Sequence, residues 1–180
     1  VALISGAGSV GPGWGNGKAT AVAFAREGAR IFAVDLAPEA AEVTRDIIAS
    51  EGGVCETHTC DVTDAAQVEA MISACVERFG RIDILVNNAA VFFSTPVATL
   101  GWADWERTLR TNLSAPFLLS LLVGRNMYQH GSGKIIFLGD WSGQRPSREF
   151  LAYCVSKSGI HALTQALAQS FAPYVQVKDR

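Results

Sequence analysis

Short apolar runs alternate with longer segments of helical period, and this alternation constrains the fold more than any other feature. The runs are VALIS, RIFAVDL, VCETHTCDV and DILVNNAA, and the segments between them are ATAVAFAREG, PEAAEVTRDIIASEG and DAAQVEAMISACVERFG. Strands separated by helices of this length need right-handed crossovers and a parallel sheet covered on both faces. The sequence therefore predicts a doubly wound α/β fold, in which ligands bind outside the carboxyl ends of the strands.

The second half of the chain continues the alternation. We expect a long helical stretch over 102–129, a strand at KIIFLG, a helix over 150–172 and the start of a strand at YVQV. No linker or internal repeat divides the chain, and 180 residues with 49% hydrophobic composition suffice to bury one core. Residues 1–180 are therefore predicted to form a single domain.

Composition and charge exclude several classes of partner. A formal net charge of −2 leaves no basic field for a nucleic acid backbone. No apolar run approaches the roughly 20 residues that span a bilayer, and no signal-type segment opens the chain. We expect no nucleic acid partner, no membrane and a cytoplasmic location. Four cysteines make no CxxC pair, so no metal site is expected; they are Cys55, Cys60, Cys75 and Cys154.

A glycine-rich loop follows the first strand. GAGSVGPGWGNGK, residues 6–18, holds six glycines in thirteen positions and enters a helix at Lys18. Glycines let the backbone approach a pyrophosphate, whose charge is then met by N–H groups and the positive end of the helix. A nucleoside triphosphatase loop is disfavoured, because Pro12 and Ala19 stand where that pattern needs Gly and Ser or Thr. The loop predicts a dinucleotide cradle.

Acidic residues end the second and third predicted strands. A carboxylate at Asp35 accepts both adenosine ribose hydroxyls and repels a 2′-phosphate, so NAD is favoured over NADP; a turn or cap role is the alternative. Asp61 caps the helix begun by Asp64 or contacts the adenine amino group. The predicted cofactor site includes their neighbours Leu36 and Val62.

NNAA at 87–90 and YCVSK at 153–157, combined with the glycine loop, resemble the short-chain dehydrogenase/reductase family over the entire length. The resemblance implies a Rossmann-type fold, a nicotinamide cofactor, and hydride transfer to or from a carbonyl, alcohol or imine carbon of a small-molecule substrate. Matching the family's TGxxxGxG makes the loop five residues longer than the pattern, with Trp14 either shielding the cofactor or lying on the surface. The implied cofactor residues are Gly6, Gly15, Asn16, Gly17, Asn88 and Ala89, together with Tyr153 and Lys157.

The resemblance also implies the catalytic residues. Tyr153 and Lys157, four residues apart, share one helix face, so the ammonium can lower the pKa of the phenol while holding the nicotinamide ribose. A phenol that normally titrates near 10 then becomes a usable acid or base. Asn112 matches the family residue that positions a water in the proton relay.

One position departs from the family pattern. Asp140 stands thirteen residues before Tyr153, where most members carry Ser. An ionised carboxylate only accepts hydrogen bonds, repels a developing alkoxide and raises the pKa of Tyr153, opposing Lys157. The change is similar to the pteridine reductase branch and suggests a C=N or pterin-like substrate, although such reductases usually use NADPH. Ser142 takes the Ser role only if the loop slips by two residues.

The chain stops at VQVKDR, where the family's sixth strand leads to a substrate lid and a final strand. We therefore expect a fold truncated before the last strand, and a non-catalytic dinucleotide-binding module is the alternative function. Helices 102–129 and 150–172 match those that pair subunits in the family, which suggests a homo-oligomer. Leucines on these helices serve either as subunit contacts or as intrachain core; they are Leu118, Leu119, Leu122, Leu163 and Leu167.

Overall fold

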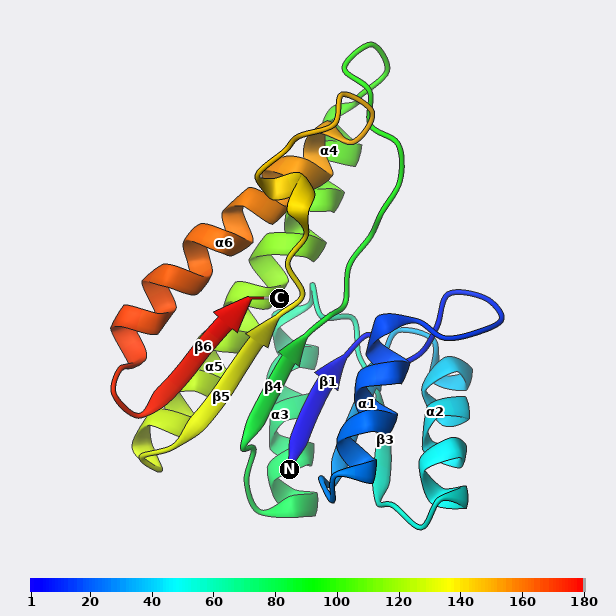
Figure 1. Ribbon diagram of the computed structural model, residues 1–180, viewed down its shortest axis with the longest axis vertical. Coiled ribbons are helices and arrows are strands. Elements are labelled where there is room, and N and C mark those ends of the chain that lie inside the picture. Colours follow the sequence, from blue (N-terminus) through cyan, green and yellow to red (C-terminus); the bar gives the residue numbers. More distant parts are fainter. Residues whose placement is uncertain (180) are drawn as a thin grey trace.

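A six-stranded parallel sheet forms the centre of the molecule. The computed structural model describes residues 1–179, and its strands follow the order β3-β2-β1-β4-β5-β6 (Figure 1). This order reverses beside β1 and is the Rossmann arrangement, so the predicted doubly wound fold is confirmed. The strands are β1 (Ala2–Ser5), β2 (Ile31–Asp35), β3 (Cys55–Thr59), β4 (Ile84–Asn87), β5 (Gly133–Phe137) and β6 (Val175–Asp179).

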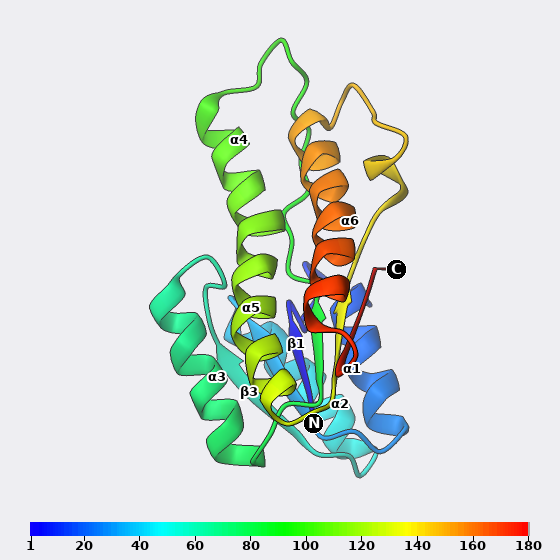
Figure 2. The same ribbon diagram turned by 90° about the vertical axis from the view of Figure 1, so that its left-hand side faces the viewer.

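Helices cover both faces of this sheet. One pair lies beside β1 in Figure 1, and a second group lies on the opposite face and comes to the front in Figure 2. The first pair shares a core cluster with the strands, and the second group shares the larger one. The first pair is α1 (Asn16–Arg26) and α2 (Pro38–Ser50); the second group is α3 (Ala65–Phe79), α5 (Ala115–Gln129) and α6 (Leu151–Phe171).

The predicted helix over 102–129 is interrupted. It consists of α4 (Trp102–Leu109), a π-helical turn over Arg110–Ser114, and α5. Asn112 lies in the turn, where its side-chain oxygen accepts from Val91 N (2.8 Å) and its amide donates to Val91 O (2.9 Å). This contact links the helical stretch to the segment after β4. The prediction of a helical stretch over 102–129 is confirmed, and Asn112 lies in the turn that interrupts it.

Leucines of the long helices belong to the intrachain core. Leu119 and Leu167 lie in the larger core cluster, and Leu118, Leu122 and Leu163 pack against it while partly buried. The core interpretation of these side chains is confirmed. Within residues 1–179, no helix combines the length and apolar character that crossing a membrane requires.

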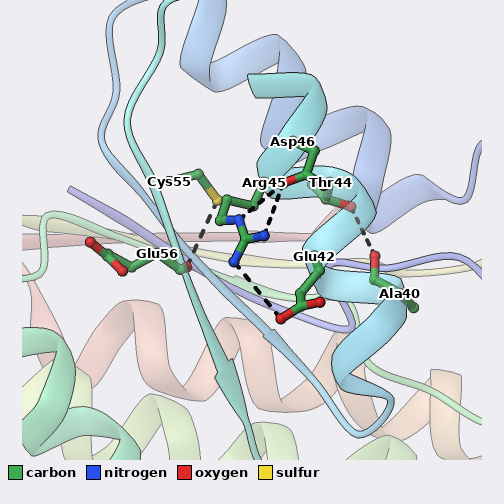
Figure 3. A network of polar contacts seen from close by, with 7 residues as sticks. All are labelled: Ala40, Glu42, Thr44, Arg45, Asp46, Cys55 and Glu56. Atoms are coloured by element: carbon green, nitrogen blue, oxygen red, sulfur yellow. Dashed lines mark hydrogen bonds and ion pairs between the residues drawn. The ribbon is translucent and has the colours of Figure 1, made fainter. Parts of the chain in front are cut away.

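Polar contacts on α2 divide into a surface group and a buried one (Figure 3). Arg45 forms ion pairs with Glu42 and Asp46 on the solvent side, where exposed pairs stabilise a fold only slightly. Thr44, fully buried, instead has its hydroxyl 2.8 Å from Ala7 O in the glycine loop and 3.4 Å from Ala40 O. Thr44 therefore anchors the glycine loop to α2.

Candidate active site

A cavity of about 810 Å³ opens at the carboxyl ends of β1, β2, β3 and β4. Its volume is that of a typical small-molecule site. All ten of the residues predicted from the loop and strand ends line it: Gly6, Gly15, Asn16, Gly17, Asp35, Leu36, Asp61, Val62, Asn88 and Ala89. Sequence reasoning missed other lining residues, among them Gly8, Ser9 and Val10, although they lie in the same glycine-rich segment.

Close approaches within the turn explain two of its glycines. A Cβ on Gly17 would collide with Gly6 O, and a Cβ on Gly8 would lie 2.9 Å from Asp35 Oδ2. Gly15 precedes α1 without a side-chain cap, so the first N–H groups of that helix have no side-chain acceptor. The turn thus presents free donors and the positive end of α1 to the cavity.

Asn88 holds the glycine turn in place from β4. Its side-chain amide donates to Ser5 O (3.1 Å) and Gly6 O (2.7 Å). Ser5 Oγ in return accepts from the backbone N–H groups of Asn88 and Ala89, both at 3.2 Å. The ends of β1 and β4 are therefore locked together beneath the cavity.

Asp35 and Asp61 both face the cavity and both bind backbone. Asp35 Oδ2 accepts from Gly8 N (2.8 Å) and Oδ1 accepts from Ala37 N (3.0 Å), so its turn role is present. Each oxygen keeps a lone pair for a further donor. Asp61 accepts from Thr63 N and Oγ1, while Asp64 caps α3. The capping alternative for Asp61 is wrong, and its proposed adenine contact stays a prediction.

Tyr153 points at Asp140. The phenol donates to Asp140 Oδ2 (3.1 Å), and Oδ1 accepts from Ser142 N (2.8 Å). Lys157, one helical turn on, places its ammonium 5.5 Å from the centre of the Tyr153 ring and donates to Leu138 O. The loop has not slipped by two residues, because Asp140 and not Ser142 faces the phenol. These three side chains come from α6 and from the segment after β5.

Asn112 lies apart from this group. Its side chain forms two hydrogen bonds with the backbone of Val91 and also donates to Ser156 Oγ (3.4 Å). Ser156 in turn donates to Tyr153 O (2.7 Å), so Asn112 reaches the phenol-bearing residue only through the backbone of α6. The water-positioning role of Asn112 stays a prediction.

Comparison with known proteins decides the family. A family model described as short chain dehydrogenase matches residues 1–179. The chain belongs to the short-chain dehydrogenase family. A relative from Mycolicibacterium smegmatis named D-threitol dehydrogenase is 41% identical over 168 residues, which cover 93% of this chain and 63% of that protein. The chain thus spans less than two thirds of the length of this curated relative.

Solved short-chain dehydrogenases share the fold closely. An NAD⁺-bound xylitol dehydrogenase matches with a TM-score of 0.92 and 32% identity, covering 99% of this chain and 67% of that one. A metagenomic short-chain oxidoreductase in complex with NADP has a TM-score of 0.92 and 30% identity, with 99% and 79% coverage. Members of the family therefore bind either dinucleotide, and the matches do not single out pteridine reductases.

This chain has residues that fit such a cofactor. A Cβ at Gly17 would collide with Gly6 O, so glycine at this position allows the tight turn that a pyrophosphate can approach closely. The N–H groups at the start of α1, which have no side-chain acceptor, suit the charge of that pyrophosphate. Asp35 suits a ribose, whereas Tyr153 and Lys157, the other two residues of the predicted cofactor set, do not line this cavity.

The electrostatics of the phenol follow the expectation based on Asp140 and differ from the one based on Lys157. Burial raises the pKa of Tyr153, and the charge and hydrogen bond of Asp140 raise it further. Burial also lowers the pKa of Lys157, against a smaller opposing effect of Asp140. The pKa of Asp140 is lowered overall, because hydrogen bonds from Ser142 and Tyr153 outweigh its own burial. The phenol is therefore held protonated beside a carboxylate.

An aromatic wall beside Tyr153 was missed by sequence reasoning. Phe92 stacks on Phe150 at 4.5 Å between ring centres and meets Tyr153 edge-on at 4.8 Å. Phe92 remains 63% exposed, so it borders the space in front of the phenol. Phe92 is 58 positions from Phe150 and 61 positions from Tyr153, so no local sequence pattern predicts these contacts.

Proposed function

We propose that this chain carries the cofactor-binding and catalytic parts of an NAD(P)-dependent oxidoreductase that transfers hydride between nicotinamide and a carbonyl or alcohol carbon. The observation that carries the proposal is the group around the Tyr153 phenol. The phenol lies 3.1 Å from Asp140 Oδ2, and the Lys157 ammonium lies 5.5 Å from the centre of the Tyr153 ring. The bound nicotinamide supplies or accepts the hydride.

The protein's own residues handle the proton. Tyr153 Oη donates a proton to the substrate oxygen during reduction and accepts it during oxidation. Lys157, a cation beside the ring, stabilises the phenolate that reduction leaves. Asp140 accepts a hydrogen bond from a donor group of the substrate and so fixes its orientation.

NAD is the proposed cofactor. Asp35 stands at the end of β2 within the cavity, and its carboxylate keeps acceptor capacity beyond the bonds from Gly8 and Ala37. Ribose hydroxyls can donate to these oxygens, whereas a 2′-phosphate would meet a like charge. The nature of this one side chain therefore supports NAD over NADP.

A polyol is the proposed substrate class. Relatives named for D-threitol and xylitol act on compounds with a hydroxyl next to the reacting carbon. Such a neighbouring hydroxyl can donate to Asp140 while the reacting oxygen meets Tyr153. A C=N or pterin-like substrate is the second candidate, because the same carboxylate can accept from its N–H groups.

Titration of the purified chain with NADH and NADPH tests the cofactor assignment, followed by oxidation assays with threitol and xylitol and reduction assays with a dihydropterin. We expect preferential NADH binding and polyol oxidation, with Tyr153→Phe lowering turnover by about 10²–10⁴-fold. Turnover of the dihydropterin alone would replace the polyol assignment. NADH binding without any turnover would favour a non-catalytic module, and failure to bind either dinucleotide would overturn the proposal.

A further inference from the structure

The glycine loop contains an inserted segment, residues 9–14, that forms part of the cavity wall. Ser9 and Val10 line the cavity, and Val10 is fully exposed. Figure 1 shows the loop, in blue, extending beyond the carboxyl edge near α1 and α2. Its base is closed by Gly15 N, which donates to Ser9 Oγ at 2.7 Å. The insertion therefore folds back on itself and adds an apolar side chain to the cofactor cleft.

Lys18 braces the far side of the insertion. Its side-chain ammonium donates to Gly13 O (2.9 Å) and lies 5.9 Å from the centre of the Trp14 ring. Lys18 is only 7% exposed, whereas Trp14 is 61% exposed and does not line the cavity. Trp14 thus covers Lys18 from the solvent side, which answers where this ring lies.

Lys18 is a buried cation in the first turn of α1, where the helix dipole is positive. Among residues 1–179, no carboxylate forms an ion pair with Lys18. An anion bound at the same turn supplies an opposite charge. The Lys18 ammonium is therefore better accommodated when a phosphate group is bound at this turn than when the turn is empty.

We propose that Lys18 is a positioning residue that holds the insertion 9–14 as a wall over the dinucleotide's diphosphate, with Val10 as the side chain that contacts the cofactor. This inference rests on the proposed cofactor site. Lys18 fixes Gly13 and Trp14, the Ser9 to Gly15 bond closes the loop, and Val10 is thereby held at the cleft. An apolar wall excludes water and strengthens the hydrogen bonds from backbone N–H groups to the phosphates.

Calorimetric titration with NADH and amide hydrogen exchange without cofactor test the proposal on the full chain. Lys18→Met keeps the stem and removes the ammonium. We expect this variant to weaken NADH binding about tenfold, because binding must then order roughly one more residue of the loop. It should also speed amide hydrogen exchange at Gly15. Lys18→Arg retains a cation and should stay within about threefold of the parent.

Other variants separate the brace from the wall and guard against misfolding. Lys134→Met, on the exposed face of β5, is the matched control and should change neither readout. Trp14→Ala removes an exposed ring, so it should fold normally while weakening NADH binding and loosening the loop. Val10→Ser should weaken binding with loop exchange unchanged.

Two results would overturn the inference: unchanged binding and exchange in both Lys18→Met and Trp14→Ala, or equal losses in Lys134→Met. If the parent chain binds no dinucleotide, the proposed function fails with it. Hydrogen exchange at Gly15 then still decides whether Lys18 braces the loop, so the two failures are distinguishable.

Discussion

At the scale of single residues, Asp140 sets the proton chemistry of the site. A carboxylate 3.1 Å from the Tyr153 phenol raises the pKa of that phenol, in addition to the larger effect of burial. Removing the charge in Asp140→Asn should therefore lower the pKa of Tyr153. Alcohol oxidation, which needs the phenolate, should then reach its alkaline plateau at lower pH, measured as the pH profile of kcat/KM.

Direct titration of phenolate absorbance provides a control that needs no substrate. Subtracting the curve of Tyr153→Phe removes the contributions of Tyr128 and Tyr174, leaving the site phenol alone. An unshifted or upward-shifted Tyr153 curve in Asp140→Asn would show that the carboxylate does not act on the phenol.

Asp35 carries the choice between the two dinucleotides. Asp35→Asn keeps an oxygen that accepts from backbone N–H and removes the charge that opposes a 2′-phosphate. The ratio of the NADPH to the NADH dissociation constant should fall about tenfold, measured by titration. Asp61→Asn, at the next strand end, is the matched control and should leave the ratio unchanged. An unaltered ratio in Asp35→Asn would remove the basis for favouring NAD.

At the scale of elements, Gly124 sets how closely α5 approaches its neighbours. A Cβ there would lie 2.6 Å from a ring carbon of Phe171 on α6 and 3.2 Å from Ile135 on β5. Gly124→Ala gains about 1 kcal/mol of helix propensity but overpacks the core, which costs about 1–3 kcal/mol. We expect a net loss in the free energy of unfolding, measured with urea.

The double variant Gly124→Ala with Phe171→Leu provides the control. If the smaller leucine side chain at position 171 relieves the contact with the new Cβ, the two substitutions should show a favourable coupling energy of about 1 kcal/mol. Additive losses, or a more stable Gly124→Ala protein, would mean that the helices adjust without strain.

The elements also show where sequence reasoning succeeds. Strands such as β1 and β4 are buried on both faces, so their apolar runs are contiguous and easily located. Periodicity alone could not predict the π-helical turn, because its Asn112 bonds to Val91, 21 residues away. Gly8 was missed for a similar reason, since its need for no Cβ comes from Asp35 and Ala40 across the fold.

The cavity residues were located from sequence because a parallel sheet gathers its strand ends at one edge, whatever the details of packing. The electrostatic balance at Tyr153 was harder to predict. It depends on how deeply the phenol is buried and on the rotamer that turns Asp140 toward it, and neither quantity is encoded in residue spacing.

At the scale of the whole molecule, the helices on one side of the sheet present apolar side chains to solvent. Figure 2 shows α4 continuing into α5, with α6 beside them. Phe117 and Tyr128 on α5 are each 43% exposed, Val155 on α6 is 42% exposed and Trp102 on α4 is 71% exposed. We propose that two copies of the chain associate through this face, because mutual burial removes these side chains from water.

Phe117→Asp tests this association. In a two-fold dimer the change acts twice and loses at least about 1.5 kcal/mol per copy, which predicts dissociation constants weakened by two orders of magnitude or more. Light scattering at micromolar concentration should then show a dimer for the parent chain and a monomer for the variant. Val43→Asp alters a 49% exposed side chain on α2, across the sheet, and should leave the dimer intact. The proposal would be wrong if the parent chain is a monomer, or if Phe117→Asp and Val43→Asp weaken the dimer equally.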